Sequence, residues 1–175
     1  MPKSAPASAA LPIVHLALRL LIVVNWIGGA MILTLLLVSP NREWIMSAFK
    51  LTPSPDTERL IIALRVIASI GLAAIPMHYA ILKRLLAIVE TVRDGDPFIA
   101  MNAQRLETIA WFMLTLQVFS MVIDAIAKSV STPAHPLNLD AGFSVSGWLG
   151  VLLTFLLARV FAAGTLMRDD LEGTV

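Results

Sequence analysis

The sequence contains no cysteine, and only 14% of its residues are charged. The lack of thiols excludes disulfide bonds, thiolate metal sites and cysteine nucleophiles. Charged residues make up about a quarter of a typical soluble domain, whereas 58% of this chain is hydrophobic and its mean hydropathy is +0.83. Thirteen lysines and arginines nearly balance twelve aspartates and glutamates, so the chain lacks the basic excess of a direct nucleic-acid binder. The composition therefore indicates a protein whose main solvent is lipid.

The motifs of common enzyme classes are also missing. The sequence has no glycine-rich phosphate loop, no G-x-S-x-G nucleophile elbow and no H-E-x-x-H zinc motif. Its histidines, His15, His78 and His135, fall on different apolar runs or on the outer side, a placement that argues against a histidine metal site. We therefore expect no metal site, no cofactor and no enzymatic activity.

Four apolar runs are each long enough to cross a bilayer, whose hydrocarbon core needs about 20 helical residues. They cover residues 13–38, 60–82, 108–127 and 145–166. None alternates as the strands of a membrane barrel do, and a helix satisfies its own backbone inside lipid. We predict an all-α integral membrane protein, a four-helix transmembrane bundle built from residues 13–167. Residues 1–12 are predicted to be a disordered lead-in, and residues 168–175 an acidic tail.

The lysines and arginines that flank the runs predict the orientation. Seven of them, counting Arg19, lie on the side that holds the N-terminus, the 83–105 loop and the C-terminal tail, and four lie on the other side. Positive residues are retained on the cytoplasmic side of a membrane. We therefore predict that both termini are cytoplasmic.

The outer connections carry signals for a short helix and for a helix start. Trp44 and its neighbours form one apolar helical face, which predicts a short interfacial helix in the first outer loop. Ser54 before Pro55 is typical of an N-cap followed by the first helical residue, so the second spanning helix is predicted to begin there. The 128–144 connection has little pattern and is predicted to be a second outer loop.

The inner loop is predicted to join two helices by a tight turn. The apolar pattern of the second run continues as far as Arg93, and Gly95 is suited to a left-handed cap after it. Either Asp96 with Pro97 or Asn102 is predicted to cap the helix that leads into the third span.

Two opposite charges, Arg65 and Asp124, lie within the second and third runs. A charge near the bilayer centre costs at least about 2.5 kcal/mol on insertion scales, so each side chain needs a partner or water. Both residues lie roughly 5–8 Å below the outer surface. We predict an Arg65–Asp124 ion pair that joins neighbouring helices, with a role in ligand binding or proton coupling as the alternative.

The inner half of the predicted bundle holds a polar cluster of Arg19, His78, Glu107 and Arg159. The simplest interpretation is that the two arginines extend to the membrane surface and that the histidine bonds to a neighbouring helix. The alternative is a positive pocket that accepts an anionic ligand or a lipid headgroup.

Two uncharged polar residues also lie within the spans. Asn25 is at mid-span beside Gly28 and Gly29, and Gln117 is in the third run. Polar side chains at close contacts between membrane helices hydrogen-bond across them. We predict such an interhelical role for both residues.

Two stretches resemble a known family. Gly-Asp-Pro-Phe at residues 95–98, followed by Asn102 and by Arg105-Leu106, is similar to the inner loop of small bacterial membrane proteins in the domain of unknown function 2975 family. Residues 159–175, in which a Phe-x-x-Gly step leads into an acidic tail ending in Thr-Val, are similar to the C-terminus of that family. The resemblance covers nearly the whole chain from residue 13 and implies a bacterial inner-membrane protein with four spans and no established reaction.

Members of the resembled family are often encoded beside a small helix-turn-helix regulator. The resemblance therefore implies, by analogy, a non-enzymatic sensor or anchor that binds and modulates a soluble transcription regulator. The residues predicted to make this cytoplasmic contact are Arg93, Asp94, Asp96, Phe98, Asn102, Arg105, Arg168, Asp169, Asp170 and Glu172. The acidic tail is suited to compete with DNA for a basic surface, because electrostatics supplies much of DNA affinity.

Other interpretations of the same sequence remain open. The intramembrane charges are compatible with a small-molecule or ion transport component that acts as an oligomer. A purely structural membrane bundle, in which the inner-loop residues only cap and pack helices, is a further alternative. Membrane lipid is a partner in each case, and a homo-oligomer is an open option.

Overall fold

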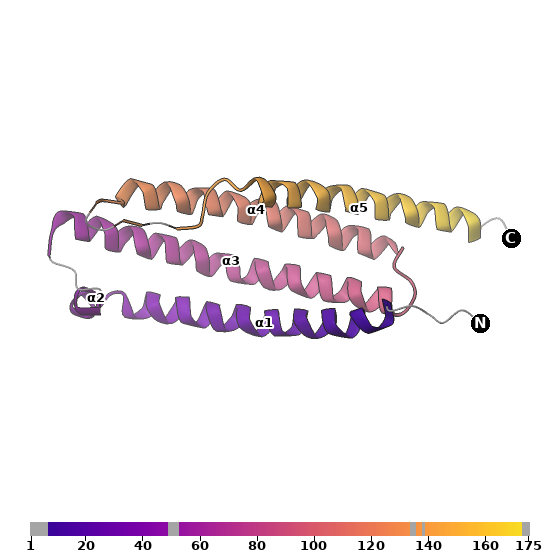
Figure 1. Cartoon of the computed structure of the whole chain (residues 1–175), viewed down its shortest axis with the longest axis horizontal. Helices are drawn as coiled ribbons and strands as arrows, with labels where there is room; N and C mark the ends of the chain where they lie inside the picture. The colour runs from indigo at the N-terminus through magenta and orange to yellow at the C-terminus, as the bar shows by residue number, and fades with distance from the viewer. Residues whose placement is uncertain (1–6, 49–52, 134–135, 138, 173–175) are drawn as a thin grey trace.

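The computed structural model describes residues 7–48, 53–133, 136–137 and 139–172, with side chains described in these ranges except at 7–10, 42, 48 and 169–172. Its helices are α1 (Ala7–Val38), α2 (Arg42–Ala48), α3 (Pro55–Arg93), α4 (Ala100–Val130) and α5 (Val145–Glu172) (Figure 1). All except α2 are long and apolar enough to cross a membrane. The predicted all-α fold with four spanning helices is confirmed, and the chain is a multi-pass membrane protein.

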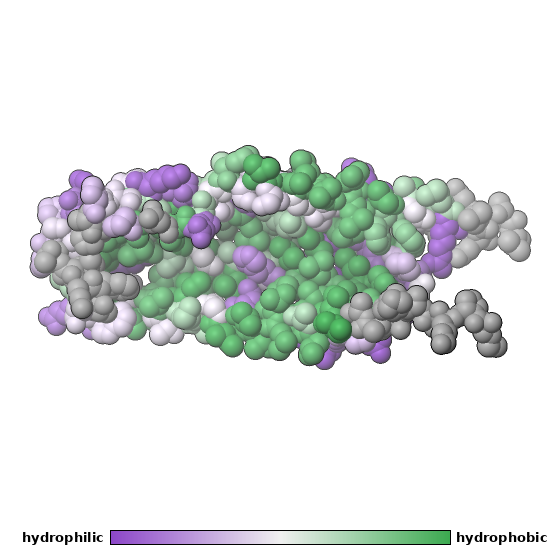
Figure 2. Space-filling model, viewed as in Figure 1, coloured by the Kyte–Doolittle hydropathy of each residue, from purple (hydrophilic) through white to green (hydrophobic). Residues whose placement is uncertain are grey.

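The four long helices lie side by side in chain order. α1 packs on α3, α3 on α4, and α4 on α5, so the bundle is an open row with α1 and α5 at its edges (Figure 1). The edge helices carry large exposed apolar side chains, for example Met31 on α1 and Leu152 on α5. Figure 2 shows a broad hydrophobic band between two ends where hydrophilic residues gather. Such an area suits a surface that lipid covers rather than water.

The ends of α3 follow the predicted local signals. The Ser54 side chain accepts a hydrogen bond from the backbone N–H of Thr57, and Pro55 is the first helical residue. The helix ends at Arg93, and Gly95 follows with a positive φ of 85°, where a side chain would be strained. The predicted N-cap and left-handed turn are both confirmed.

Two predicted helix starts differ from the structure. α1 begins at Ala7 and includes Pro12, so the predicted lead-in of residues 1–12 is helical from residue 7. Alanine has the highest helix propensity, which favours a helix through this alanine-rich start. α4 begins at Ala100 after Ile99, whose side chain makes no capping bond, so the prediction that Asp96 or Asn102 caps this helix is wrong.

The contact between α1 and α3 matches the prediction for Asn25. Its side-chain amide donates to the carbonyl oxygen of Ile75 on α3 at 3.2 Å. Next to it, a Cβ placed on Gly29 would lie 3.0 Å from the Ile75 side chain. Glycine at this position therefore permits the close helix approach that the hydrogen bond requires.

The connection between α4 and α5 does not stay outside the predicted third span. Its buried Gly142 lies against Gln117 and Ser120, which are about 15–20 Å from the end of α4 at Val130. α5 consequently begins beside the middle of α4, and the segment before it runs back along α4 (Figure 1). The 128–144 connection is therefore only partly an outer loop.

Candidate functional site

Residues 94–105, which comprise the turn between α3 and α4 and the first residues of α4, are arranged around one buried amide. Asn102 has no exposed surface. Its side-chain nitrogen donates to the Thr91 hydroxyl at 2.6 Å and to the Pro97 carbonyl at 2.8 Å, and its oxygen accepts from Arg105 at 2.8 Å. A buried amide pays little desolvation penalty only when its donors and acceptor are all bonded, as they are here. We call residues 94–105 the inner elbow.

Two further contacts join the inner elbow to α5. The Phe98 ring packs on Phe161, with ring centroids 5.2 Å apart, and a Cβ on Gly164 would lie 2.8 Å from the Phe98 ring. The Arg168 guanidinium forms an ion pair with the Asp96 carboxylate. The glycine of the Phe-x-x-Gly step is thus where an aromatic ring of the elbow meets α5. Together these contacts connect the ends of three helices.

The residues predicted to contact a cytoplasmic partner therefore divide into two groups. Asn102, Arg105, Asp96 and Arg168 are used in bonds within the chain, and Arg105 also donates to the Ala87 carbonyl at 3.3 Å.

Members of the second group are exposed. Arg93 and Asp94 are on the surface, and no side-chain hydrogen bond or ion pair is formed by either within the described part of the chain. Phe98 remains 43% exposed although it packs on α5. The side chains of Asp169, Asp170 and Glu172 lie outside the described residues. Of the predicted contact residues whose side chains are described, Arg93 at the end of α3 and Asp94 and Phe98 on the inner elbow are thus the exposed ones.

A cavity of about 460 Å³ lies between α4 and α5, next to the inner elbow. Its charged lining residues are Glu107 on α4 and Arg159 on α5, and Trp111 and Phe155 form an edge-to-face aromatic pair in its wall. Both charged side chains are exposed, and no ion pair between them is formed in the described structure. We call this space the α4–α5 cavity; it presents opposite charges to one volume and can hold a polar or zwitterionic ligand.

The predicted inner polar cluster is separated in the structure. Glu107 and Arg159 share the α4–α5 cavity, whereas Arg19 is exposed on α1 at the other edge of the row. The His78 ring nitrogen Nδ1 lies 2.9 Å from the Ala74 carbonyl oxygen of its own helix, not of a neighbouring one as predicted. An open row explains the separation, because α1 and α3 do not face the groove between α4 and α5.

The structure also contains an inner-end contact that the sequence did not predict. His15 on α1 lies 3.7 Å from the Glu90 carboxylate on α3. The signal in the sequence was a polar residue near the start of α1 and another near the end of α3, two ends that lie together because the helices are antiparallel.

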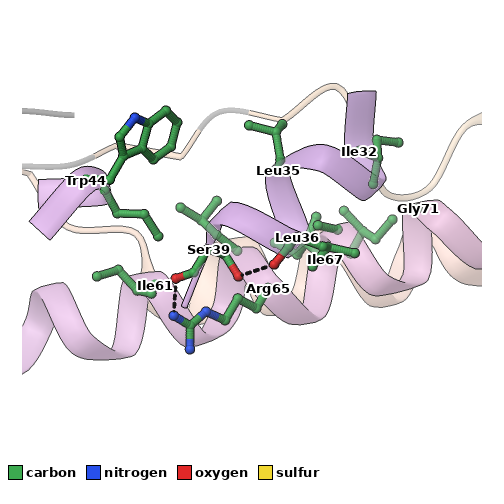
Figure 3. Close-up of a pocket in the computed structure, with 13 residues that line it drawn as sticks. Ile32, Leu35, Leu36, Ser39, Trp44, Ile61, Arg65, Ile67 and Gly71 are labelled. Atoms are coloured by element: carbon green, nitrogen blue, oxygen red, sulfur yellow. Dashed lines mark hydrogen bonds between the residues drawn. The ribbon is translucent and has the colours of Figure 1, made fainter. Parts of the chain in front are cut away.

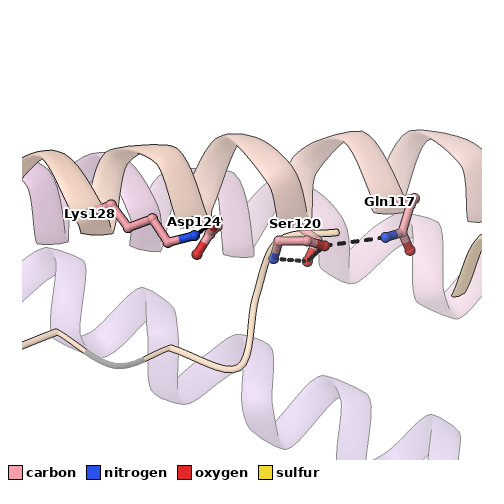
Figure 4. Close-up of polar contacts among 5 residues, drawn as sticks. Gln117, Ser120, Asp124 and Lys128 are labelled. Carbon is pink, nitrogen blue, oxygen red and sulfur yellow. Dashed lines mark hydrogen bonds and ion pairs between the residues drawn. The ribbon is translucent and has the colours of Figure 1, made fainter. Parts of the chain in front are cut away.

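The predicted ion pair between Arg65 and Asp124 is not formed within the described residues. Arg65 donates to the backbone carbonyl of Ser39 at the end of α1, and Asp124 pairs with Lys128, one turn later on α4, at 2.7 Å (Figures 3 and 4). Similar depth in the membrane was the basis of the prediction. Depth alone does not fix which way a side chain points around its helix, and here the two residues find different partners.

A row of polar residues on α4 binds the segment that precedes α5. The amide of Gln117 donates to the Gly142 carbonyl at 3.3 Å, and the Ser120 hydroxyl accepts from the Gly142 N–H at 3.1 Å (Figure 4). Gln117 therefore bonds to irregular backbone and not to a helix, which corrects the prediction. Backbone at membrane depth needs such partners because lipid supplies none. The spacing of Gln117, Ser120 and Asp124 along one helix face was the signal in the sequence.

Comparison with known proteins places the chain in one family. Residues 48–175 match the model of a family described as "Protein of unknown function (DUF2975)". The chain matches no curated protein, and it matches no solved structure. The family match includes the inner elbow, the α4–α5 cavity and all of α5. The chain belongs to the DUF2975 family.

Proposed function

We propose that this protein is a non-enzymatic sensor of the bacterial inner membrane, with both termini in the cytoplasm, and that its inner elbow binds a small cytoplasmic helix-turn-helix regulator. The observation that carries the proposal is the position of the α4–α5 cavity. It is lined by Ala100 and Ala103 at the start of α4 and by Thr165 near the end of α5. The two alanines belong to the inner elbow, and Thr165 follows Gly164, which faces the Phe98 ring, so a ligand-sized space and the proposed cytoplasmic surface share the same two helix ends.

The contacts of the inner elbow supply a physical link between cavity and surface. α4 and α5 are joined there by the Asp96–Arg168 ion pair and by the Phe98–Phe161 ring contact. A ligand that binds better to one spacing of α4 and α5 than to another shifts the population toward that spacing. The elbow then changes with it, because its side chains hold both helices.

The exposed charges at the junction of α3 and the inner elbow, Arg93 and Asp94, are the proposed contact surface. Arg93 and Asp94 make no side-chain bond that the fold needs in the described structure, so they are free for a partner. Paired charges of opposite sign set the specificity and the association rate of an interface more than its raw affinity. The family resemblance supplies the kind of partner, a small helix-turn-helix regulator encoded beside the gene.

The test is co-purification of the tagged full-length protein with that regulator in detergent. We expect the wild-type chain to retain the regulator and the double substitution Arg93→Ala/Asp94→Ala to lose most of it. The matched control is Asp56→Ala/Arg59→Ala, which removes the same two charge types from exposed positions at the other end of α3. Absence of a complex with the wild-type chain, or equal loss in both double substitutions, would refute the proposed surface.

The orientation is tested by cysteine labelling, since the chain has no natural cysteine. Asp94→Cys at the inner elbow and Asp56→Cys at the start of α3 are exposed positions at opposite ends of the bundle. In intact cells, a membrane-impermeant maleimide should label Asp56→Cys and leave Asp94→Cys unlabelled until the cells are opened. Labelling in the reverse pattern would place the elbow outside the cytoplasm.

Transport is the second candidate, because the α4–α5 cavity holds two charges that are not paired with each other. Transporters that alternate access often use helices broken near the bilayer midplane, whereas α1, α3, α4 and α5 each run unbroken between their bounds. Transport would therefore need several copies. A monomer by light scattering in detergent and in nanodiscs would argue against this candidate.

A further inference from the structure

A second cavity, of about 360 Å³, lies toward the other end of the row (Figure 3). α1, α2 and α3 line it, with Ile123 contributed by α4. Its size is at the lower end of the range of about 300–1,000 Å³ that is usual for small-molecule sites. Its wall consists almost entirely of aliphatic side chains, such as Leu35 and Ile67, together with the ring of Trp44. We call it the outer cavity.

Arg65 is the one charged residue among those that line the outer cavity. One terminal nitrogen of its guanidinium donates to the Ser39 carbonyl at the end of α1, which offsets part of the positive charge. Its Nε is buried and has no hydrogen-bond partner among the described residues. The described residues that line the cavity include no acidic side chain. In this part of the chain, an arginine thus enters an apolar space with one donor unsatisfied and no counter-charge, an arrangement that is costly unless an anion completes it.

The position of the outer cavity places Arg65 near the level of lipid headgroups. Arg65 lies six residues after the exposed Arg59, which is about 9 Å along the helix. α2 covers the same end and keeps Trp44 partly exposed, as interfacial tryptophans are in membrane proteins. A long arginine side chain at this depth can reach the phosphate level while the space beside it stays in hydrocarbon.

From these observations we propose that the outer cavity is a binding site for an anionic glycerophospholipid. One acyl chain occupies the apolar space beside Leu35 and Ile67, and a phosphate oxygen accepts from the Arg65 guanidinium, whose hydrogen-bonding capacity is incompletely used among the described residues. Arginine matches phosphate because its planar donors bond two oxygens at once. The absence of an acidic lining residue disfavours headgroups with an ammonium group, so phosphatidylglycerol is preferred over phosphatidylethanolamine and phosphatidylcholine. This site is at the opposite end from the inner elbow and does not depend on the proposed function.

Fluorescence of Trp44 reports directly on the outer cavity. The chain has four tryptophans, so the test protein carries Trp26→Phe, Trp111→Phe and Trp148→Phe in the full-length sequence. It is reconstituted in phosphatidylcholine vesicles that contain a fixed fraction of one lipid with brominated acyl chains, because bromine quenches a tryptophan that it contacts. The brominated lipid is phosphatidylglycerol, phosphatidylethanolamine or phosphatidylcholine in parallel samples.

We expect quenching that corresponds to about fivefold tighter association of phosphatidylglycerol than of phosphatidylcholine, the effect of one basic residue on an anionic lipid. Arg65→Gln should remove this preference, and Arg65→Lys should keep part of it because the charge remains. Arg159→Gln is the matched control, since it removes an arginine from the other cavity and should leave Trp44 quenching unchanged.

Several outcomes would overturn the proposal. Equal quenching by the three lipids would make the outer cavity a non-selective acyl crevice, and a preference that persists in Arg65→Gln would remove Arg65 from the site. Quenching by a brominated fatty acid that phosphatidylglycerol does not displace would assign the cavity to a free fatty acid. The comparison of lipids uses the chain that retains Arg65, so it decides the question even if Arg65→Gln fails to fold.

Discussion

Two regions of the bundle, the inner elbow and the contact between α4 and the segment before α5, are held by different sets of hydrogen bonds. At the inner end, the single buried side chain of Asn102 bonds to groups of α3, α4 and the turn between them. Beside the middle of α4, Gln117 and Ser120 divide the bonds to one stretch of irregular backbone at Gly142. The inner end therefore depends on one residue with several bonds, whereas the contact at Gly142 depends on two residues with one or two bonds each. Single substitutions should therefore affect the inner end more.

The largest effect is expected from Asn102→Leu. The change removes three side-chain hydrogen bonds in a part-buried region, so the Pro97 carbonyl loses its donor, and Thr91 and Arg105 keep only their bonds to the Ile88 and Ala87 carbonyls. We expect the free energy of unfolding in mixed micelles to fall by about 2–4 kcal/mol. Asn25→Leu, which removes one interhelical bond, is the control and should lower it by about 1 kcal/mol. Equal losses would show that the three hydrogen bonds of Asn102 stabilise the protein no more than the single bond of Asn25.

The next effect compares the two glycines with positive φ. Gly142→Ala introduces strain at a φ of 107° and brings a Cβ within 2.8 Å of an Asp124 oxygen, so we expect a loss of about 2–3 kcal/mol. Gly95→Ala has the strain at a φ of 85° but open space around the Cβ, so about 1 kcal/mol should be lost. Thermal unfolding in one detergent ranks the two. A larger loss for Gly95→Ala would show that the α4–α5 connection is not packed as described.

A local effect is expected from Ser120→Ala. This change removes the acceptor of the Gly142 N–H while Gln117 still binds the Gly142 carbonyl. Amide hydrogen exchange at Gly142 should become about tenfold faster, which corresponds to about 1.4 kcal/mol, and exchange in the inner elbow should not change. If exchange rises both at Gly142 and in the inner elbow, the two regions unfold together and are not stabilised independently.

The smallest effect is expected from Lys128→Ala. Lys128 pairs with Asp124 one turn away, but its side chain is 75% exposed. Exposed pairs with this spacing contribute about 0.3–0.5 kcal/mol. We expect a loss within about 0.5 kcal/mol in thermal unfolding. A loss above about 1 kcal/mol would show that Lys128 stabilises the segment before α5 through Asp124. The contact at Gly142 would then depend on a network of bonds, as the inner elbow does.

Features that depend on neighbouring residues in the chain were predictable. The Ser54 cap, the helix end at Arg93 and the turn at Gly95 depend on local geometry that sequence patterns record. Asn25 was predictable too, since small residues beside it indicate a close helix contact. The partner of Arg65 was not predictable, because it depends on the rotation of α3 about its axis and on where α1 ends. Asn102 is of a residue type that often caps helices, but its actual hydrogen-bond partners depend on how α3 and α4 pack together.

The sequence by itself determined that this chain is a membrane protein with four apolar helices, because length and hydropathy alone decide which segments lipid can accommodate. It also determined where α3 begins and ends, because capping depends on residues within one turn. Only the tertiary structure decided that the helices form an open row, that α5 begins beside the middle of α4, and that Glu107 and Arg159 share a cavity while Arg19 lies apart. Those outcomes depend on which faces of the helices pack together, and a periodic apolar sequence leaves that choice to the contacts among residues distant in the chain.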